Sequence, residues 1–200
     1  PGLCMHFRCS ALGDSRVKKR NFRLGTTSFI YPDHIIPNVQ KIGRFFDEIE
    51  LLVFESKPWE WVPSKADVAE LKKLGKDLNL TYNIHLPVDV SLTDESAMKR
   101  QEAADTLKKV VERFAPLSPT SHTLHLDMDK SMSASADLKS WKDLADHGLG
   151  LFIPWLDDPG RISVETLWYR PRIFEPLIRQ YNLSVCADLG HHFKYGYDME

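Results

Sequence analysis

Several side chains that can bind a metal ion stand at the ends of short apolar runs in this sequence. His85, His125 and Glu165 each close such a run. Asp188 closes a fourth run, and His191 follows it by three residues. Imidazoles together with carboxylates suit Zn²⁺, Mn²⁺ or Fe²⁺ better than Ca²⁺ or Mg²⁺. The pattern therefore predicts a divalent-metal centre, in which the carboxylate of Glu165 could bridge more than one ion.

These residues can meet only if the runs are neighbouring strands that end at the same edge of a sheet. Within the runs, apolar and polar residues alternate, as where Ile162 and Val164 are opposed by Ser163 and Glu165. Successive side chains of a strand point to opposite faces, so each run has an apolar face and a polar face. We expect the apolar residues, with Val185 in the last run, to face helices and the metal-capable residues to face inward.

The rest of the chain alternates β-type runs with longer amphipathic stretches. We expect strands over residues 22–27, 48–54, 80–86, 121–126, 161–167 and 183–188. Helices are expected over about 32–46, 65–79, 95–114, 138–147 and 172–181, with Pro63 and Ser64 capping the second. Strands that alternate with helices in this way indicate parallel βαβ units with right-handed crossovers.

The loop after the first strand separates the two α/β folds that this alternation allows. An open doubly wound sheet usually has a Gly-rich loop there, whereas residues 27–30 read Thr-Ser-Phe-Ile. We therefore predict a TIM (β/α)8-type barrel. A full barrel takes about 250 residues, so this chain is expected to supply only the first six βα units. The barrel would span 22–200, after a poorly ordered N-terminal extension over 1–21.

Composition narrows the classes of function. The formal net charge is −2, without the basic surplus from which DNA-binding proteins take much of their affinity, so no nucleic-acid partner is expected. No apolar run approaches the roughly 20 residues that span a bilayer, and no hydrophobic run follows the basic cluster at 16–20. The cysteines, Cys4, Cys9 and Cys186, are too few and too scattered for a disulfide framework. We expect a cytoplasmic protein without a membrane partner.

Four further residues are candidates for substrate binding. Trp59 and Trp61 follow the second strand on the expected active face, where they either line a pocket for a large flat ligand or anchor their loop. Thr27 ends the first strand. Glu55 follows the second strand, in phase with Leu51.

Four segments of the chain resemble the xylose-isomerase-like TIM-barrel superfamily, which includes endonuclease IV-type enzymes and sugar isomerases and epimerases. They are Tyr-Asn-Ile-His-Leu-Pro at 82–87, Leu-His-Leu-Asp at 124–127, Ser-Val-Glu-Thr at 163–166 and Cys-Ala-Asp-Leu-Gly-His at 186–191. The last contains an element similar to the superfamily's D-x-x-H, formed by Asp188 and His191. The superfamily completes its site with ligands from strands seven and eight.

His85 and His125 distinguish between the phosphodiesterases and the sugar epimerases of this superfamily. The resemblance implies that endonuclease IV-like phosphodiesterases use a His at the ends of strands three and four, with a bridging Glu on strand five. The sugar epimerases bind one ion through Glu and Asp of strands five and six and through residues of strands seven and eight. The presence of both His85 and His125 favours the phosphodiesterase side.

More narrowly, residues 23–30, 50–56 and 85–87 resemble the cobamide-remodelling phosphodiesterases, which cleave the phosphodiester of the cobamide nucleotide loop. The resemblance implies that His85 and His125 hold one ion and that Glu165 bridges to a second ion bound by Asp188. It also implies that His191 serves a further ion or contacts the substrate, which makes Glu165 and His191 the catalytic candidates. A water activated by the metal would attack phosphorus.

Two alternatives stay open. In a sugar or sugar-phosphate isomerase or epimerase, Glu165 would act as a proton-transfer base beside a single Mn²⁺. In a non-catalytic barrel, the same residues would bind a corrinoid or a metal without turnover. All three interpretations expect a small-molecule partner, a corrinoid or a sugar phosphate, and none specifies the oligomeric state.

Overall fold

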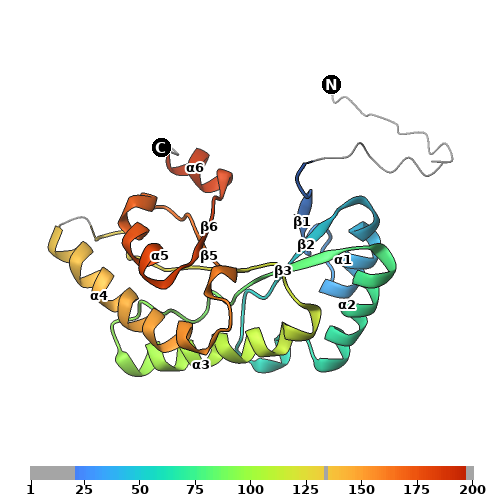
Figure 1. The fold of residues 1–200 in the computed structure, drawn as a ribbon, viewed down its shortest axis with the longest axis horizontal. Coiled ribbons are helices and arrows are strands. Elements are labelled where there is room, and N and C mark those ends of the chain that lie inside the picture. Colours follow the sequence, from blue (N-terminus) through green and yellow to red (C-terminus); the bar gives the residue numbers. More distant parts are fainter. Residues whose placement is uncertain (1–20, 133–134, 197–200) are drawn as a thin grey trace.

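The structure of the protein is a computed structural model that describes residues 21–132 and 135–196. Its strands form one parallel sheet in the order β1-β2-β3-β4-β5-β6 (Figure 1). They are β1 Gly25–Thr27, β2 Glu48–Leu52, β3 Thr81–His85, β4 His122–Leu124, β5 Ile162–Glu165 and β6 Ser184–Cys186. The order in the sheet follows the order in the chain, as in a barrel, whereas a doubly wound sheet reverses at a switch point. The predicted barrel-type fold is confirmed over these six units.

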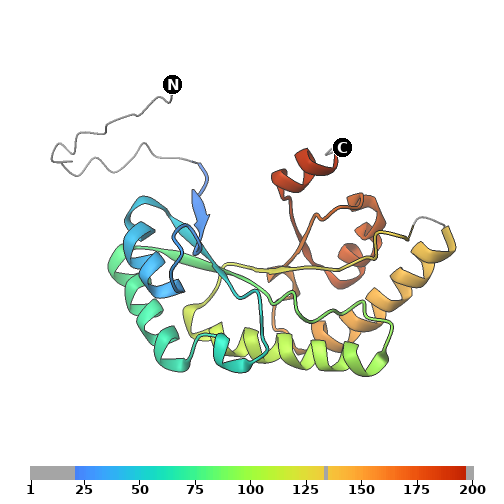
Figure 2. The same ribbon diagram turned by 180° about the vertical axis from the view of Figure 1, so that it is seen from behind.

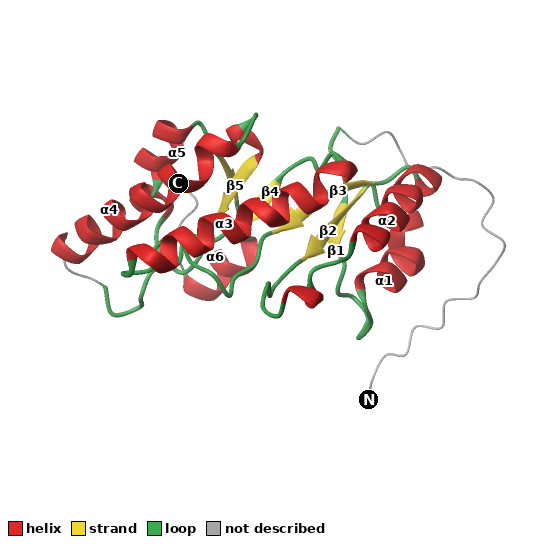
Figure 3. Ribbon diagram, turned by 90° about the horizontal axis from the view of Figure 1, so that it is seen from below, coloured by secondary structure: helices red, strands yellow, loops and turns green. Residues whose placement is uncertain are grey.

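Six α-helices lie in the described residues, and all but the last lie along the outside of the curved sheet (Figures 1 and 2). They are α1 Ile35–Ile42, α2 Lys65–Leu78, α3 Ala97–Phe114, α4 Ser135–Phe152, α5 Glu175–Tyr181 and α6 Leu189–Tyr195. Helices α1 to α5 follow one another in an arc around the strands, whereas α6 stands apart near the C-terminus (Figures 1 and 2). Seen from below, α3 crosses the strands that it covers (Figure 3). The predicted extension, apart from Asn21, lies outside the described residues.

The start of α2 shows how the sequence sets an element boundary. The Ser64 hydroxyl accepts a hydrogen bond from the Asp67 amide, and the Asp67 carboxylate accepts one from the Ser64 amide. This reciprocal capping box satisfies amide groups that have no partner inside the helix. The helix ends at Asn79, whose φ of 53° places it in the left-handed conformation that terminates many helices.

The core lies between the outer face of the sheet and the helices. Ile49, Ile84 and Val164 are fully buried there, and the Tyr82 hydroxyl donates to the Leu71 carbonyl of α2. The apolar sets of β3 to β5 therefore face the helices as predicted. Val185 of β6 is in register with Val164 and therefore lies on the same face of the sheet, but it is 48% exposed. This strand is at the edge of the described sheet, where fewer described residues cover it.

Several element boundaries differ from prediction. The first strand begins at Gly25, and α4 runs over 135–152 rather than 138–147. The predicted helix stops before Gly148, but this glycine lies inside α4, where a Cβ would be 2.0 Å from the Leu92 carbonyl oxygen. Gly148 therefore does not end the helix; it allows α4 to lie close to the backbone of Leu92. Helix α6 was not predicted; the Asp188 side chain caps it by accepting from the His191 amide.

None of the helices in the described part of the chain combines the length and the apolar character that crossing a membrane requires.

Candidate metal centre

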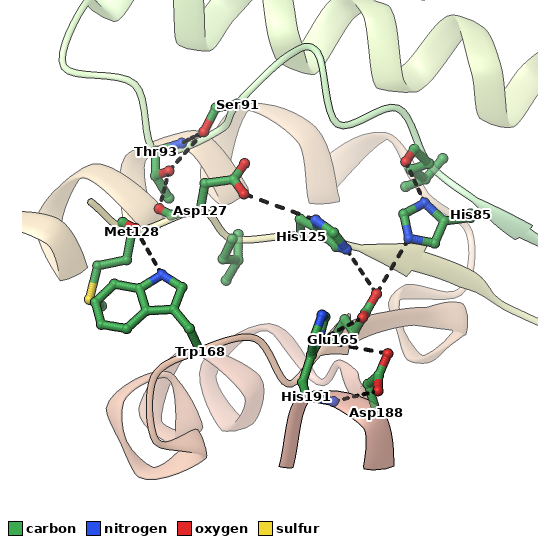
Figure 4. A network of polar contacts seen from close by, with 12 residues as sticks. His85, Ser91, Thr93, His125, Asp127, Met128, Glu165, Trp168, Asp188 and His191 are labelled. Atoms are coloured by element: carbon green, nitrogen blue, oxygen red, sulfur yellow. Dashed lines mark hydrogen bonds and ion pairs between the residues drawn. The ribbon is translucent and has the colours of Figure 1, made fainter. Parts of the chain in front are cut away.

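The carboxyl ends of β3 to β6 bring all five predicted metal-binding residues together (Figure 4). Two groups of potential ligands result. His85, His125 and Glu165 form the first, and Glu165, Asp188 and His191 form the second, with the ligand atoms of each group within 4.8 Å of one another. Glu165 belongs to both groups. The spacing is that of atoms able to share an ion.

In the first group, two imidazoles converge on one carboxylate oxygen. Glu165 Oε2 lies 2.8 Å from His125 Nε2 and 3.4 Å from His85 Nε2. The two rings meet edge to face, with centroids 4.9 Å apart. The side chains of Glu165 and His85 are 7% and 9% exposed. A buried carboxylate whose described partners are histidines, and no lysine or arginine, fits a site that a cation completes.

The second group uses the other oxygen of the same carboxylate. Glu165 Oε1 lies 3.2 Å from His191 Nδ1, and Asp188 Oδ2 lies 3.7 Å from the same nitrogen. His191 Nδ1 is also 2.9 Å from the Thr166 carbonyl oxygen. Each oxygen of Glu165 thus faces a different group of potential ligand residues.

The backbone fixes which nitrogen of His85 can bind a metal. His85 Nδ1 is 2.9 Å from the Leu86 carbonyl oxygen. Because a carbonyl oxygen only accepts, Nδ1 carries the proton and Nε2 is the nitrogen left to coordinate. Hydrogen bonds of this kind orient metal-binding histidines in many proteins.

The electrostatics agree with this geometry. Burial disfavours the charged form of Glu165, but hydrogen bonds from His125 and His85 outweigh it and hold the Glu165 pKa well below its ordinary value. Burial lowers the His85 pKa, but the hydrogen bond to Glu165 and the negative charge of Glu50 outweigh it, so this pKa is raised. The first group therefore holds a negative charge that draws positive charge towards it.

The loop that carries His125 is held by donors from three other segments. Its Asp127 carbonyl accepts from Thr93 Oγ1 at 2.6 Å and from Trp141 Nε1 at 2.7 Å. The Met128 carbonyl accepts from Trp168 Nε1 at 3.0 Å. Figure 4 shows this indole and the threonine reaching the loop from opposite sides. Hydrogen bonds to successive carbonyls position the loop, and with it His125.

Sequence reasoning missed Glu50. Thr123 Oγ1 donates to Glu50 Oε1 at 3.0 Å, and Glu50 contributes to the raised pKa of His85. Glu50 shares the polar phase of β2 with Glu48, opposite Ile49. The alternation of Glu48, Ile49 and Glu50 is the signal that could have identified it.

Cys186 lies near the same cluster as a thiol. Burial, followed by the negative charges of Glu165, Glu50 and Asp188, raises the Cys186 pKa to about 11. A thiol with this pKa is protonated near neutral pH.

The four candidates for substrate binding lie outside the two ligand groups. Trp61 and Glu55 are exposed and line a separate groove that also includes Phe54. Trp59 is partly buried against the core, with the Arg113 guanidinium 5.5 Å from its ring centroid. Thr27 ends β1 opposite Glu50. Their role in substrate binding stays a prediction.

Comparison with known proteins places this geometry among related folds. Residues 36–200 match the family model described as xylose isomerase-like TIM barrel. No curated protein matches the chain.

Three solved structures illustrate the similarity. A D-tagatose 3-epimerase-like protein has a TM-score of 0.70 and 16% identity, over 85% of this chain and 66% of that one. The 3-keto-D-glucoside 4-epimerase from E. coli has a TM-score of 0.66 and 14% identity, over 88% of this chain and 71% of that one. Endonuclease IV from Thermus thermophilus has a TM-score of 0.58 and 20% identity, over 84% of this chain and 63% of that one. The chain thus spans about two thirds of the length of these structures, and at such identities the similarity shows the fold.

Proposed function

The chain belongs to the xylose isomerase-like TIM barrel family, and on this premise we propose that it is a divalent-metal-dependent phosphodiesterase. Its proposed substrate is a cobamide, cleaved at the phosphodiester of the nucleotide loop. The observation that carries the proposal is the position of Glu165, whose two oxygens face two separate ligand groups. A pair of ions clamped in this way suits in-line displacement at phosphorus, where the attacking and the leaving oxygen both need stabilisation.

Each residue of the centre has a role in this proposal. His85 and His125 would hold one ion together with Glu165, and Asp188 and His191 would hold the other. When bound, divalent ions supply Lewis acidity towards a phosphoryl oxygen. The hydrogen bond from His85 Nδ1 to the Leu86 carbonyl keeps that ring oriented. The His191 side chain is 29% exposed, so its imidazole reaches the face from which a substrate approaches.

The charge of the chain supports a small substrate over a nucleic acid. Proteins that cleave DNA must neutralise several phosphates, usually with lysines and arginines. This chain has 26 basic and 28 acidic residues. A corrinoid offers one phosphodiester on a bulky, largely neutral body, which needs no basic surface.

The test is to incubate the purified, metal-loaded protein with an adenosylated cobamide, with and without a chelator, and to detect released α-riboside by mass spectrometry. We expect release that the chelator abolishes. A folded, metal-loaded protein that releases nothing would contradict the proposed substrate, and release that persists in chelator would contradict the role of the metal.

A sugar isomerase or epimerase is the second candidate. The observation that favours it is the group formed by Glu165, Asp188 and His191, since the resemblance gives epimerases a Glu and an Asp from strands five and six. In that reaction Glu165 would move a proton beside a single ion. Turnover of free keto-sugars, followed by chromatography, without cleavage of the cobamide would favour this candidate. Tight cobamide retention without either reaction would favour a binding protein.

A further inference from the structure

A groove lined by aromatic side chains lies beside the metal centre. It has a volume of about 650 Å³, and its lining includes Phe29, Phe54, Glu55, Glu60 and Trp61; we call it the aromatic groove. Cavities that bind small molecules have volumes of roughly 300–1,000 Å³. Phe29 is 63%, Phe54 44% and Trp61 59% exposed. Aromatic side chains gathered and exposed in this way usually mark a binding surface.

Phe54 connects this groove to the metal centre. Its ring lines the groove and meets the His85 imidazole edge to face, with centroids 5.5 Å apart. His85 is in turn one of the two histidines that converge on Glu165. A ligand in the aromatic groove is therefore separated from a metal-binding residue by a single aromatic ring.

The charge of the lining points to the chemistry of the ligand. Four carboxylates line the groove, and none of the described residues that line it is a lysine or an arginine. Asp33 is occupied by Lys41 and Asp67 by the α2 cap. Within the described residues, Glu55 and Glu60 make no hydrogen bond or ion pair. Two uncommitted carboxylates beside aromatic rings favour hydrogen-bond donors or positive charge and disfavour phosphate.

We propose that the aromatic groove binds a planar nitrogen heterocycle bearing N–H donors or positive charge, as the part of the substrate next to the scissile phosphodiester. The proposal rests on the proposed function, and it adds the subsite that selects the substrate. Trp61 and Phe54 provide stacking surfaces, and Glu55 and Glu60 accept hydrogen bonds. A nucleotide-loop base that carries an exocyclic amino group, as adenine does, belongs to this class of ligand.

A binding experiment tests the subsite without turnover. The full chain is titrated with the 1,3-dimethylbenzimidazolium cation and, separately, with 2-naphthoate, while the tryptophan indole NMR signals are followed. The Trp61→Phe variant assigns the Trp61 signal. We expect the cation alone to shift that signal to saturation, and Glu55→Gln to weaken binding by about threefold, the scale of an exposed charge interaction. The matched control is Trp155→Phe, since Trp155 is 66% exposed and is not among the groove residues. Equal binding of the anion would overturn the proposal, and so would an undisturbed Trp61 signal.

A kinetic experiment separates this proposal from the proposed function. Trp61→Ala should raise KM for the cobamide about tenfold, the scale of one lost base–aromatic stack, with kcat retained. Turnover of bis(p-nitrophenyl) phosphate, which carries neither N–H donors nor positive charge, reports on the metal centre by itself, and the control Trp155→Phe should leave the turnover of both diesters unchanged. An unchanged cobamide KM would overturn the groove proposal alone. Absence of turnover with both diesters, while the cation still binds, would overturn the proposed function alone. Self-association that Trp61→Ala abolishes would assign the groove to a second copy of the chain and overturn the proposal.

Discussion

At the scale of single residues, the centre depends on one carboxylate. Glu165 is the only residue among the described ones that belongs to both ligand groups. Its side chain is 7% exposed, so its charge is stabilised by neighbouring imidazoles rather than by water. Replacing any one of the three histidines would disturb one group, whereas replacing Glu165 disturbs both.

Glu165→Gln should keep the fold and lose most of the activity. The amide has nearly the same shape, but it carries no charge and bridges two cations poorly. Ions at such sites contribute several kcal/mol to the transition state, which corresponds to a loss of about 10²–10³-fold in kcat. Steady-state kinetics and circular dichroism measure the two effects. The control is Glu112→Gln, the same change at an exposed position of α3. Turnover at the original rate in Glu165→Gln would refute the bridging role.

At the scale of elements, side-chain caps decide where helices begin. Ser64 caps α2 through its hydroxyl, whereas Ser96 precedes α3 without a side-chain cap hydrogen bond. Ser64→Ala should lower the free energy of unfolding by about 1 kcal/mol, the usual contribution of an N-cap. Ser96→Ala, the matched change, should leave it nearly unchanged. Urea unfolding of both variants measures the difference, and equal losses would show that the capping box contributes little.

The loop after β4 permits a second test at this scale. Trp168→Phe keeps a large ring but removes the N–H that donates to the Met128 carbonyl. We expect a loss of about 1 kcal/mol in stability and roughly tenfold in metal affinity, as when groups that orient ligands are removed. Competition with a chromophoric chelator measures the affinity. Trp155→Phe is the control. Unchanged affinity in Trp168→Phe would show that the loop holds His125 without this hydrogen bond.

Local sequence patterns predicted some of these elements and site residues, and missed others for physical reasons. Period-two alternation gave the inward faces of β3 to β5, so His85 and Glu165 could be found from single strands. Glu50 was missed, although Glu48 shares its phase, because the two leucines that follow it break the alternation. Helix α6 was missed because its cap, Asp188, was interpreted only as a ligand. The extent of α4 depends on a close approach between Gly148 and Leu92, which no local pattern contains.

At the scale of the whole molecule, a buried histidine links stability to pH. His122 is 6% exposed, and neither of its ring nitrogens has a hydrogen-bond partner among the described residues. Burial, assisted by the Arg161 charge, lowers its pKa to about 4. The unfolded chain, with an ordinary pKa near 6.5, binds the proton first as the pH falls. The free energy of unfolding therefore decreases from pH 6.5 towards pH 4.

His122→Leu should make the unfolding free energy less dependent on pH. Between pH 7 and pH 5 the His122 contribution amounts to about 2 kcal/mol, and the leucine variant should lack it. The raised pKa of His85 acts in the opposite direction, because its stabilisation is complete below pH 6.5 and is lost as the pH rises. The free energies of unfolding of the variant and the unchanged protein are therefore measured with urea at both pH values. Their difference isolates the contribution of His122. His34→Leu, at an exposed position, is the control, and parallel pH profiles for His122→Leu and the unchanged protein would contradict the assignment.

The anchoring of residues 126–128 has a consequence for how ions enter and leave. Neutral donors, among them the indoles of Trp141 and Trp168, hold the carbonyls of Asp127 and Met128, and none of these hydrogen bonds involves a metal. The loop that positions His125 is thus already ordered before an ion binds. Binding then requires that the ion lose its water, but it requires little ordering of the chain. We expect demetallation to be reversible without refolding. If the proposed centre binds its ion in this way, the identity of the ion would follow the supply in the surroundings rather than the moment of folding.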